Sequence, residues 1–136
     1  MEVFNRNTNK GRKVMVARRT SLTEHALQKQ IVQLFRQLGF KVFVLDAMSG
    51  AGYFRKDDPR RFAFIADLKA RGYTVGQPDL CVVRNKVIFL ELKKSTRSRV
   101  RPEQHDMYDW LIGHGHNAFI ISSVDEALRI ANNELN

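Results

Sequence analysis

Charged side chains border two strongly apolar runs in the stretch from Gly76 to Ser95, GQPDLCVVRNKVIFLELKKS. Asp79 stands at the start of the first run, and Glu91 and Lys93 stand at the end of the second. A charge that is taken out of water must be paired or bound to a metal. Carboxylate oxygens suit Mg²⁺, and an ammonium group can stabilise the charge that develops on phosphate. The three residues therefore predict a metal site that acts on phosphodiesters.

Two short strands are expected to position these groups. Leu80–Val83 and Val87–Leu92 are apolar runs separated by a tight turn at 84–86, which predicts a hairpin that brings Asp79 next to Glu91. Because side chains alternate along a strand, Glu91 and Lys93 should share one face with Phe89. The backbone carbonyl of Leu92 then offers a further oxygen ligand.

The remaining segments complete the order α-β-α-β-β-α-β-α and predict a single α/β domain. Apolar residues at helical spacing indicate a first helix from Ser21 to about Leu38, with Ser21-Leu-Thr-Glu24 as a capping box. The other expected elements are a strand over 41–45, a loop over 46–57, a helix from Pro59 to Gly72, a helix from Pro102, a strand over 118–121 and a closing helix capped by Ser123-Val-Asp-Glu126.

A structural interpretation of the charged residues stays open from these patterns alone. Asp79 can simply start a strand after a proline turn, while Glu91 and Lys93 form a salt bridge. Short motifs of this kind also arise by chance. Their combination within three neighbouring strands favours the catalytic interpretation.

Composition limits the classes of protein to which the chain can belong. The 136 residues are 43% apolar, enough for one compact domain with a core. A single cysteine, Cys81, excludes an internal disulfide framework and favours a reducing compartment. No apolar run approaches the ~20 residues that span a bilayer, and no apolar segment follows the basic start as in a secretory signal. We therefore expect a cytoplasmic protein with no membrane partner.

A net charge of +9 favours a polyanionic partner, most commonly nucleic acid. Residues 1–20 carry six basic residues and one acidic residue and lack helical periodicity, which predicts a flexible basic arm; a solubilising tail is the alternative. Two further basic groups are candidates for nucleic-acid contacts. They are Lys94, Arg97, Arg99 and Arg101 after the predicted site, and Arg55, Lys56, Arg60 and Arg61 near the predicted second helix.

From about Ser21 to Ala131 the chain resembles the PD-(D/E)XK nuclease superfamily and, within it, the stand-alone, virus-type members of the VRR-NUC family. The resemblance is carried by the G-x-P-D turn, the Glu91-Leu92-Lys93 strand, a helix start at Pro102-Glu103-Gln104, an acidic first helix and the closing GHNAFIISSVDEAL. It implies a restriction-endonuclease-like αβββαβ core, a central mixed sheet flanked by helices, over a domain of residues 21–136.

The same resemblance implies a DNA endonuclease that depends on Mg²⁺ or Mn²⁺, with Glu24, Asp79, Glu91, Lys93 and Gln104 as catalytic residues. Asp79, Glu91 and the Leu92 carbonyl would hold the metal, with Glu24 contributing through a water. The implied substrate is branched DNA such as a Holliday junction, and the implied assembly is a homodimer. A nucleic-acid-binding module without catalysis, or a subunit that cleaves only with a larger partner, is the alternative.

Glu24 and Gln104 each have a structural alternative. Glu24 precedes Leu27 and Ile31 at helical spacing, so we expect it on or near the buried stripe of its helix; otherwise it is the capping partner of Ser21. Gln104 should share a face with Leu111 and orient a water, a metal ligand or Lys93; otherwise it only caps its helix.

Overall fold

A computed structural model describes residues 23–45 and 53–135, and the predicted basic arm lies outside these residues. Every expected element of this part is present and in the predicted order. The elements are α1 (Glu24–Gln37), β1 (Lys41–Val44), α2 (Pro59–Ala70), β2 (Leu80–Val83), β3 (Val87–Leu92), α3 (Pro102–Gly113), β4 (Asn117–Ile121) and α4 (Val124–Leu135).

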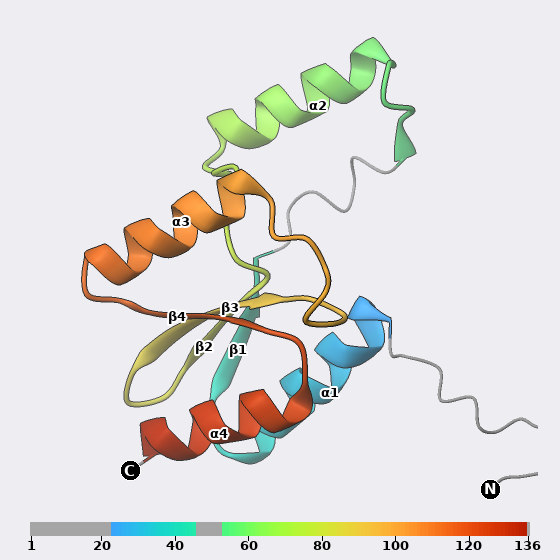
Figure 1. Cartoon of the computed structure of the whole chain (residues 1–136). Helices are drawn as coiled ribbons and strands as arrows, with labels where there is room; N and C mark the ends of the chain where they lie inside the picture. The colour runs from blue at the N-terminus through green and yellow to red at the C-terminus, as the bar shows by residue number, and fades with distance from the viewer. Residues whose placement is uncertain (1–22, 46–52, 136) are drawn as a thin grey trace, which may run out of the picture.

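The four strands form one mixed sheet in the order β1-β2-β3-β4. The first three strands pair antiparallel, whereas β3 and β4 are parallel because α3 provides the crossover between them. Helices α1 and α4 lie on one face of the sheet and α3 lies on the other, while α2 projects away beyond α3 (Figure 1). The predicted mixed sheet with flanking helices is confirmed.

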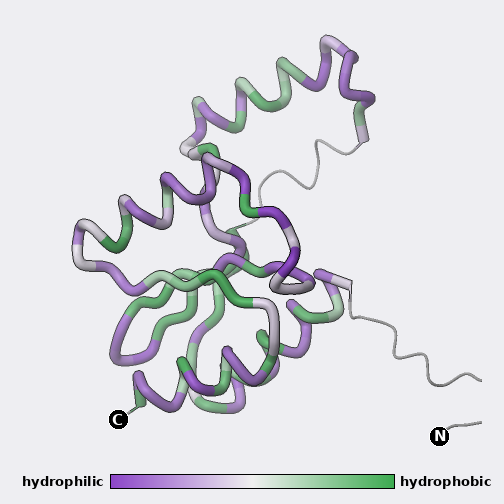
Figure 2. Tube along the Cα trace, in the orientation of Figure 1, coloured by the Kyte–Doolittle hydropathy of each residue, from purple (hydrophilic) through white to green (hydrophobic). Residues whose placement is uncertain are grey.

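The hydrophobic core lies between the sheet and the α1–α4 pair. Ile88, Leu90 and Leu92 of β3 are buried and point into it, as strand alternation predicts. Leu27, Ile31 and Phe35 of α1 meet them from the helix side. Figure 2 shows hydrophobic residues concentrated along the strands and on the helices that cover them.

The start of α1 differs from the prediction. The helix begins at Glu24 rather than Ser21, because the Thr23 hydroxyl accepts a hydrogen bond from the Ala26 amide at 3.0 Å and so caps the first turn. Glu24 is therefore the first helical residue and is exposed, which makes its expected place on or near the buried stripe wrong. Ser21 lies outside the described residues.

The other helix starts agree with the sequence signals. Asp58 caps α2 by accepting from the Arg60 amide at 2.9 Å, with Pro59 as the first helical residue. At α4 the Ser123 hydroxyl accepts from the Glu126 amide at 3.1 Å, and the Glu126 carboxylate accepts from the Ser122 amide at 2.8 Å. This reciprocal arrangement is the predicted cap.

The Glu126 cap predicts a pH-dependent contribution to stability. Its hydrogen bond from the Ser122 backbone lowers the pKa of Glu126, so the ionised form favours the fold. We expect Glu126→Gln to lower the free energy of unfolding at pH 7 by about 0.3–1 kcal/mol, the range for an acidic group at a helix start. The difference should shrink as the pH falls through the Glu126 pKa, which melting curves at pH 7 and pH 3 would test. An unchanged difference at both pH values would contradict this role.

Candidate active site

Asp79 and Glu91 meet at the mouth of the β2–β3 hairpin, as the sequence predicted. The register pairs Leu80 with Leu90, so the residues directly beyond that pair face each other. The Asp79 carboxylate also accepts a hydrogen bond from the Leu92 amide at 2.8 Å. Glu91 thus lies within β3, and Asp79 lies directly before β2, where this hydrogen bond holds its side chain.

Gln104 joins the two charged residues of β3 and the segment after it. Its side-chain nitrogen donates to Glu91 Oε2 at 2.7 Å, while its side-chain oxygen accepts from Lys93 Nζ at 2.8 Å. The same oxygen accepts from the Arg101 amide at 3.0 Å, so Gln104 also caps its helix. Lys93 Nζ lies 3.4 Å from Glu91 Oε2. The orienting role and the capping role expected of Gln104 are therefore made by the same side chain.

The electrostatics of this group suit a bound cation. Glu91 is buried, and burial together with the nearby Asp79 carboxylate raises the pKa of Glu91 to about 7, although Lys93 opposes the shift. A divalent cation held by both carboxylates would remove their mutual repulsion and favour the ionised form of each. The two carboxylates of Asp79 and Glu91 are oxygen donors of the kind that fits Mg²⁺ or Mn²⁺, and a part for the Leu92 carbonyl stays a prediction.

Glu24 takes no part in the hydrogen bonds and the ion pair described above for this group. It lies exposed in the first turn of α1, a helix that packs against β1, β3 and α4. Within residues 23–45 and 53–135, no group of three or more His, Cys, Asp or Glu side chains lies close enough to hold a metal ion. A part for Glu24 through a water stays a prediction.

Gly76 explains why the turn before Asp79 has its composition. Its backbone has φ +85°, a conformation that glycine adopts readily. A Cβ at this position would lie 2.5 Å from the carbonyl carbon of Glu103 and 3.1 Å from the amide nitrogen of Gln104. The turn and the first turn of α3 are therefore in backbone contact, and Gln104 is held over Glu91 by this contact.

Gln77 is a positioning residue that the sequence reasoning missed. Its side-chain nitrogen donates to the Leu45 carbonyl at 2.5 Å, and its side-chain oxygen accepts from the Thr74 amide at 3.1 Å. The Leu45 amide in turn donates to the Asp79 carbonyl at 2.8 Å. The only signal in the sequence was its place between the glycine and the proline of the turn.

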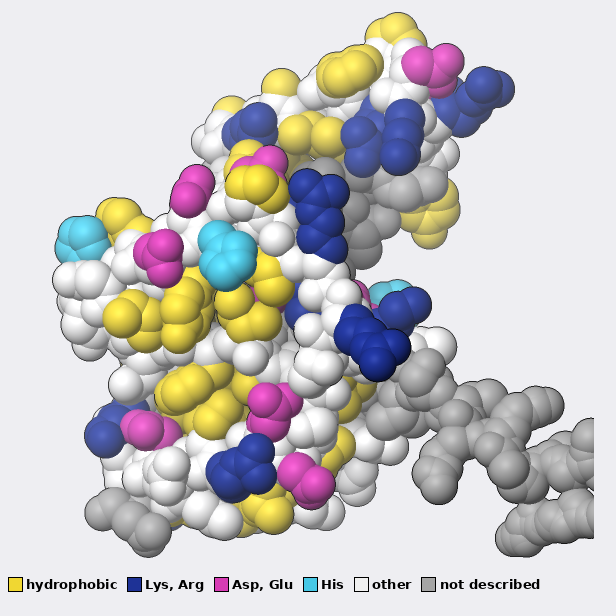
Figure 3. Space-filling view, viewed as in Figure 1, with side chains coloured by type: hydrophobic (Ala, Val, Ile, Leu, Met, Phe, Trp, Pro, Cys, Tyr) yellow, Lys and Arg dark blue, Asp and Glu magenta, His cyan; other side chains and the backbone are white. Residues whose placement is uncertain are grey.

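The basic residues after β3 are exposed beside the acidic group. Lys94, Arg97, Arg99 and Arg101 all belong to the short connection between β3 and α3, whose last amide donates to Gln104. Lys and Arg side chains gather along the right-hand side of the view in Figure 3, from α2 downward. This surface is electrostatically suited to phosphate contacts.

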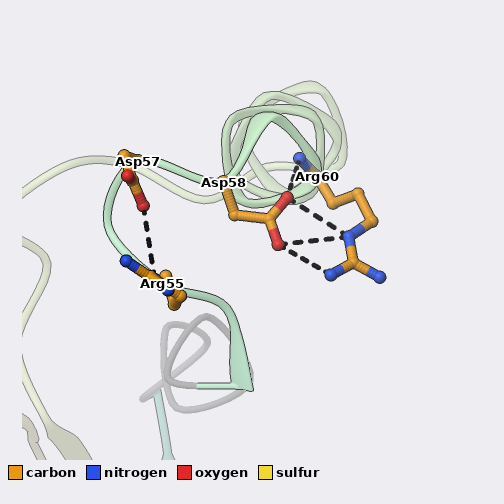
Figure 4. A network of polar contacts seen from close by, with 4 residues as sticks. All are labelled: Arg55, Asp57, Asp58 and Arg60. Carbon is orange, nitrogen blue, oxygen red and sulfur yellow. Dashed lines mark hydrogen bonds and ion pairs between the residues drawn. The ribbon is translucent and has the colours of Figure 1, made fainter.

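Two members of the second basic group form ion pairs with neighbouring carboxylates. Arg60 pairs with Asp58 at 2.7 Å (Figure 4), and its guanidinium lies 5.4 Å from the centre of the Phe54 ring. Arg55 pairs with Asp57 at 3.6 Å, and Arg61 is half-buried. Lys56 is exposed.

The histidines and the single cysteine are not grouped as metal ligands in the described parts of the chain. All four histidines are exposed, and none belongs to a group that could hold a metal within the described parts of the chain. Cys81 is half-buried in β2, where burial raises the pKa of its thiol. It packs within the sheet.

Comparisons with known proteins agree with this architecture. No protein-family model and no curated protein sequence matches the chain. A solved structure described as a VRR_NUC domain superposes with a TM-score of 0.57 at 22% identity, covering 80% of this chain and 94% of that one. A second, described as a VRR_NUC domain protein, gives a TM-score of 0.62 at 19% identity over 84% of this chain and 88% of that one.

The chain has the fold of a VRR_NUC domain. The structural likeness supports the resemblance that the motifs indicated, and it covers most of both chains in each comparison. Among the helices that the structure describes, none is long and apolar enough to cross a bilayer.

The Gly76 contact predicts an unusually costly small substitution. Gly76→Ala should destabilise the fold by about 2–4 kcal/mol, because it combines a left-handed alanine with an overpacked backbone contact. Gly72→Ala is the matched control: φ is also positive at +113°, but nothing lies within 4 Å of the added Cβ. Chemical denaturation of both variants would test this, and equal losses would show that the contact with α3 is unimportant.

Replacing Glu91 by glutamine is predicted to stabilise the fold at high pH, whereas Gly76→Ala is predicted to destabilise it. Because the pKa of Glu91 is raised from 4.5 to about 7 in the fold, its contribution to stability is fully present below pH 4.5 and is lost as the pH rises through 7. Glu91→Gln cannot ionise and can still accept from Gln104. With a chelator present at pH 8, the free energy of unfolding of Glu91→Gln should therefore exceed that of the parent, by at most about 3 kcal/mol. Chemical denaturation of both proteins measures this difference.

The difference in the free energy of unfolding between Glu91→Gln and the parent should become smaller toward pH 5, where the parent carboxyl is protonated. A less stable Glu91→Gln at pH 8 would show that the ionised carboxylate is favourable without a metal.

Proposed function

We propose that the chain belongs to the VRR-NUC family and is a DNA endonuclease that depends on Mg²⁺ or Mn²⁺. The observation that carries the proposal is the group formed by Asp79, Glu91, Lys93 and Gln104. It keeps two carboxylates and a lysine partly or wholly out of water, and links Glu91 to Lys93 through the side-chain amide of Gln104. A fold that needed only packing at this place would be better served by apolar residues.

Each side chain has a definable part in hydrolysis. Asp79, Glu91 and the Leu92 carbonyl would hold the cation, and Glu24 would contribute through a water. When bound, the cation supplies positive charge at the phosphate and a lower pKa for an attacking water. Water attacks the phosphorus and loses a proton, while the bond to the leaving oxygen breaks and that oxygen takes up a proton.

Lys93 faces the place where negative charge develops on the phosphate oxygens. Its Nζ is held by the Gln104 oxygen and lies close to Glu91, so the ammonium is already oriented before substrate binds. Pre-oriented charge of this kind stabilises a transition state without reorganisation. Gln104 acts through Glu91 and Lys93 and is a positioning residue.

The substrate in this proposal is structured DNA, such as a four-way junction, recognised by shape and charge. The described chain is small and has no separate domain for reading bases, whereas the exposed basic connection after β3 stands next to the acidic group. A homodimer would present two such sites and allow paired incisions. DNA binding without cleavage, or cleavage only with a partner protein, is the alternative outcome.

Cleavage of a labelled four-way junction and a matched linear duplex, in Mg²⁺, Mn²⁺ or EDTA, tests the proposal. The parent chain should cut the junction only with metal. Lys93→Ala, Asp79→Ala and Glu91→Ala should each reduce the rate by 100-fold or more, about 3 kcal/mol of transition-state stabilisation, while DNA binding by gel shift is retained.

Lys94→Ala is the matched control, because Lys94 is adjacent in sequence but exposed. It should weaken DNA binding, and the affinity of this variant should fall less steeply with rising salt than the affinity of the parent. The cleavage rate at saturating DNA should be unchanged. Full cleavage by Lys93→Ala would contradict the active site, and binding with no cleavage in any metal would favour the non-catalytic alternative.

A further inference from the structure

The face of the sheet that carries α3 is covered over only half its width. One row of residues crosses this face in register, from Phe43 through Cys81 and Phe89 to Ala118. Ala118, beneath α3, is 3% exposed, Cys81 and Phe89 are half-buried, and Phe43 at the far edge is 55% exposed. Apolar surface is therefore left open beside α3, on the β1–β2 side.

A groove runs along this open side. It has a volume of about 690 Å³ and is lined mainly by apolar side chains. They include Leu45, Val75, Pro78, Phe89, Met107 and Trp110. Trp110 is 54% exposed, and apolar surface of this kind next to polar rim residues is typical of an interaction site.

Helix α2 offers a second exposed apolar surface, because it has apolar residues on two opposite faces. Its inner face packs on flanking segments: Phe64 lies 5.9 Å from the Phe54 ring, and Leu68 is buried. Its outer face is exposed throughout and consists of Pro59, Phe62, Ala63, Ala66 and Ala70. Phe62 is 61% exposed, and hydrophobic side chains are visible along α2 in Figure 3.

A helix that is apolar on both sides is expected to be buried on both sides. Helix α2 instead projects from the body (Figure 1). The alanines of the outer face would let it approach a partner surface closely, and Phe62 would supply an apolar anchor.

Charge distinguishes the partner for each surface. The helix of the groove, α3, carries Glu103, Asp106 and Asp109 and no lysine or arginine, a charge of −3 in a chain of +9. That acidic rim would repel DNA and attract a basic apolar segment. Residues 55–71, which include α2 and its C-cap, carry six basic and three acidic residues, a charge of +3. Arg55, Arg60 and Arg71 form ion pairs with Asp57, Asp58 and Asp67, so the net positive charge comes from Lys56, Arg61 and Lys69.

We infer that two copies of this chain pair by exchanging α2: the outer face of α2 from each copy lies in the groove beside α3 of the other. This rests on the homodimer of the proposed function and specifies its interface. The groove includes Pro78 and Glu103, the neighbours of Asp79 and Gln104, so each docked helix would lie against the two segments that hold the active-site group. The arrangement is two-fold symmetric and closes after two copies.

The test is the mass of the full chain in solution, measured by light scattering during gel filtration. The parent should have twice the 15.7 kDa chain mass. Phe62→Glu breaks the outer face of α2, Trp110→Glu breaks the groove, and each variant alone should be monomeric with an unchanged circular dichroism spectrum. Leu128→Glu is the matched control, because Leu128 is 39% exposed on α4, outside both surfaces; it should stay dimeric.

Mixing the two broken variants gives the decisive result. In a mixed pair the intact α2 of the Trp110→Glu chain can enter the intact groove of the Phe62→Glu chain, so one of the two junctions is restored. The mixture should therefore form dimers, at an affinity below the parent's, although neither variant does so alone. Pairing of α2 with α2, or of sheet edges, would not give this complementation.

A monomeric parent at every concentration reached, a dimeric Phe62→Glu, or a mixture that stays monomeric would overturn the inference. Mass is measured without DNA or metal, so these results are separate from the cleavage assay. A dimer that does not cleave would leave the exchange standing and remove the nuclease, and a cleaving monomer would do the reverse.

Discussion

The burial of Glu91 is the constraint on which the arrangement of this protein depends. A buried carboxylate near the C-terminal end of the central strand β3 costs free energy unless hydrogen-bond donors and cations surround it. The fold supplies them from a helix that follows eleven residues later in the chain, through Gln104, and from the next-but-one residue, Lys93. Helix α3 must therefore dock with its first turn over the strand end, and the crossover that makes β3 and β4 parallel places it there.

Gly76 and Gln77 show how closely the surrounding segments are matched to that docking. The turn before β2 touches the backbone of α3, while the Gln77 side chain ties the end of β1 to the same turn. Three segments far apart in sequence thus meet within one hydrogen-bonded layer around the acidic group. Helices α1 and α4 bury the opposite face of the sheet.

Local signals were sufficient for the elements and for the pairing of Asp79 with Glu91, because a short hairpin fixes its own register. They failed where neighbouring residues compete for one role or where contacts are long-range. Serine and threonine, the residue types at positions 21 and 23, both cap helices well, and the structure uses Thr23. The ion pair between Arg60 and Asp58 was likewise not predicted from the sequence.

The position of α2 was also beyond reach of the sequence, because apolar residues on two opposite faces do not say which neighbour covers each. The bridging role of Gln104 could be anticipated only in outline. Its two partners were named by motif, but the hydrogen bonds depend on where the crossover places the helix.

Asp79 takes part in the ladder of the sheet as well as in the acidic group. Its backbone carbonyl accepts from Leu45 on one side, and its carboxylate accepts from the Leu92 amide on the other, where a main-chain oxygen would ordinarily be expected. Strand pairing and ligand placement are thus selected through the same atoms. A substitution at Asp79 therefore removes a rung of the sheet together with the carboxylate, whereas a substitution at Lys93 removes the ammonium and leaves the backbone hydrogen bond from its amide to Ile121 in place.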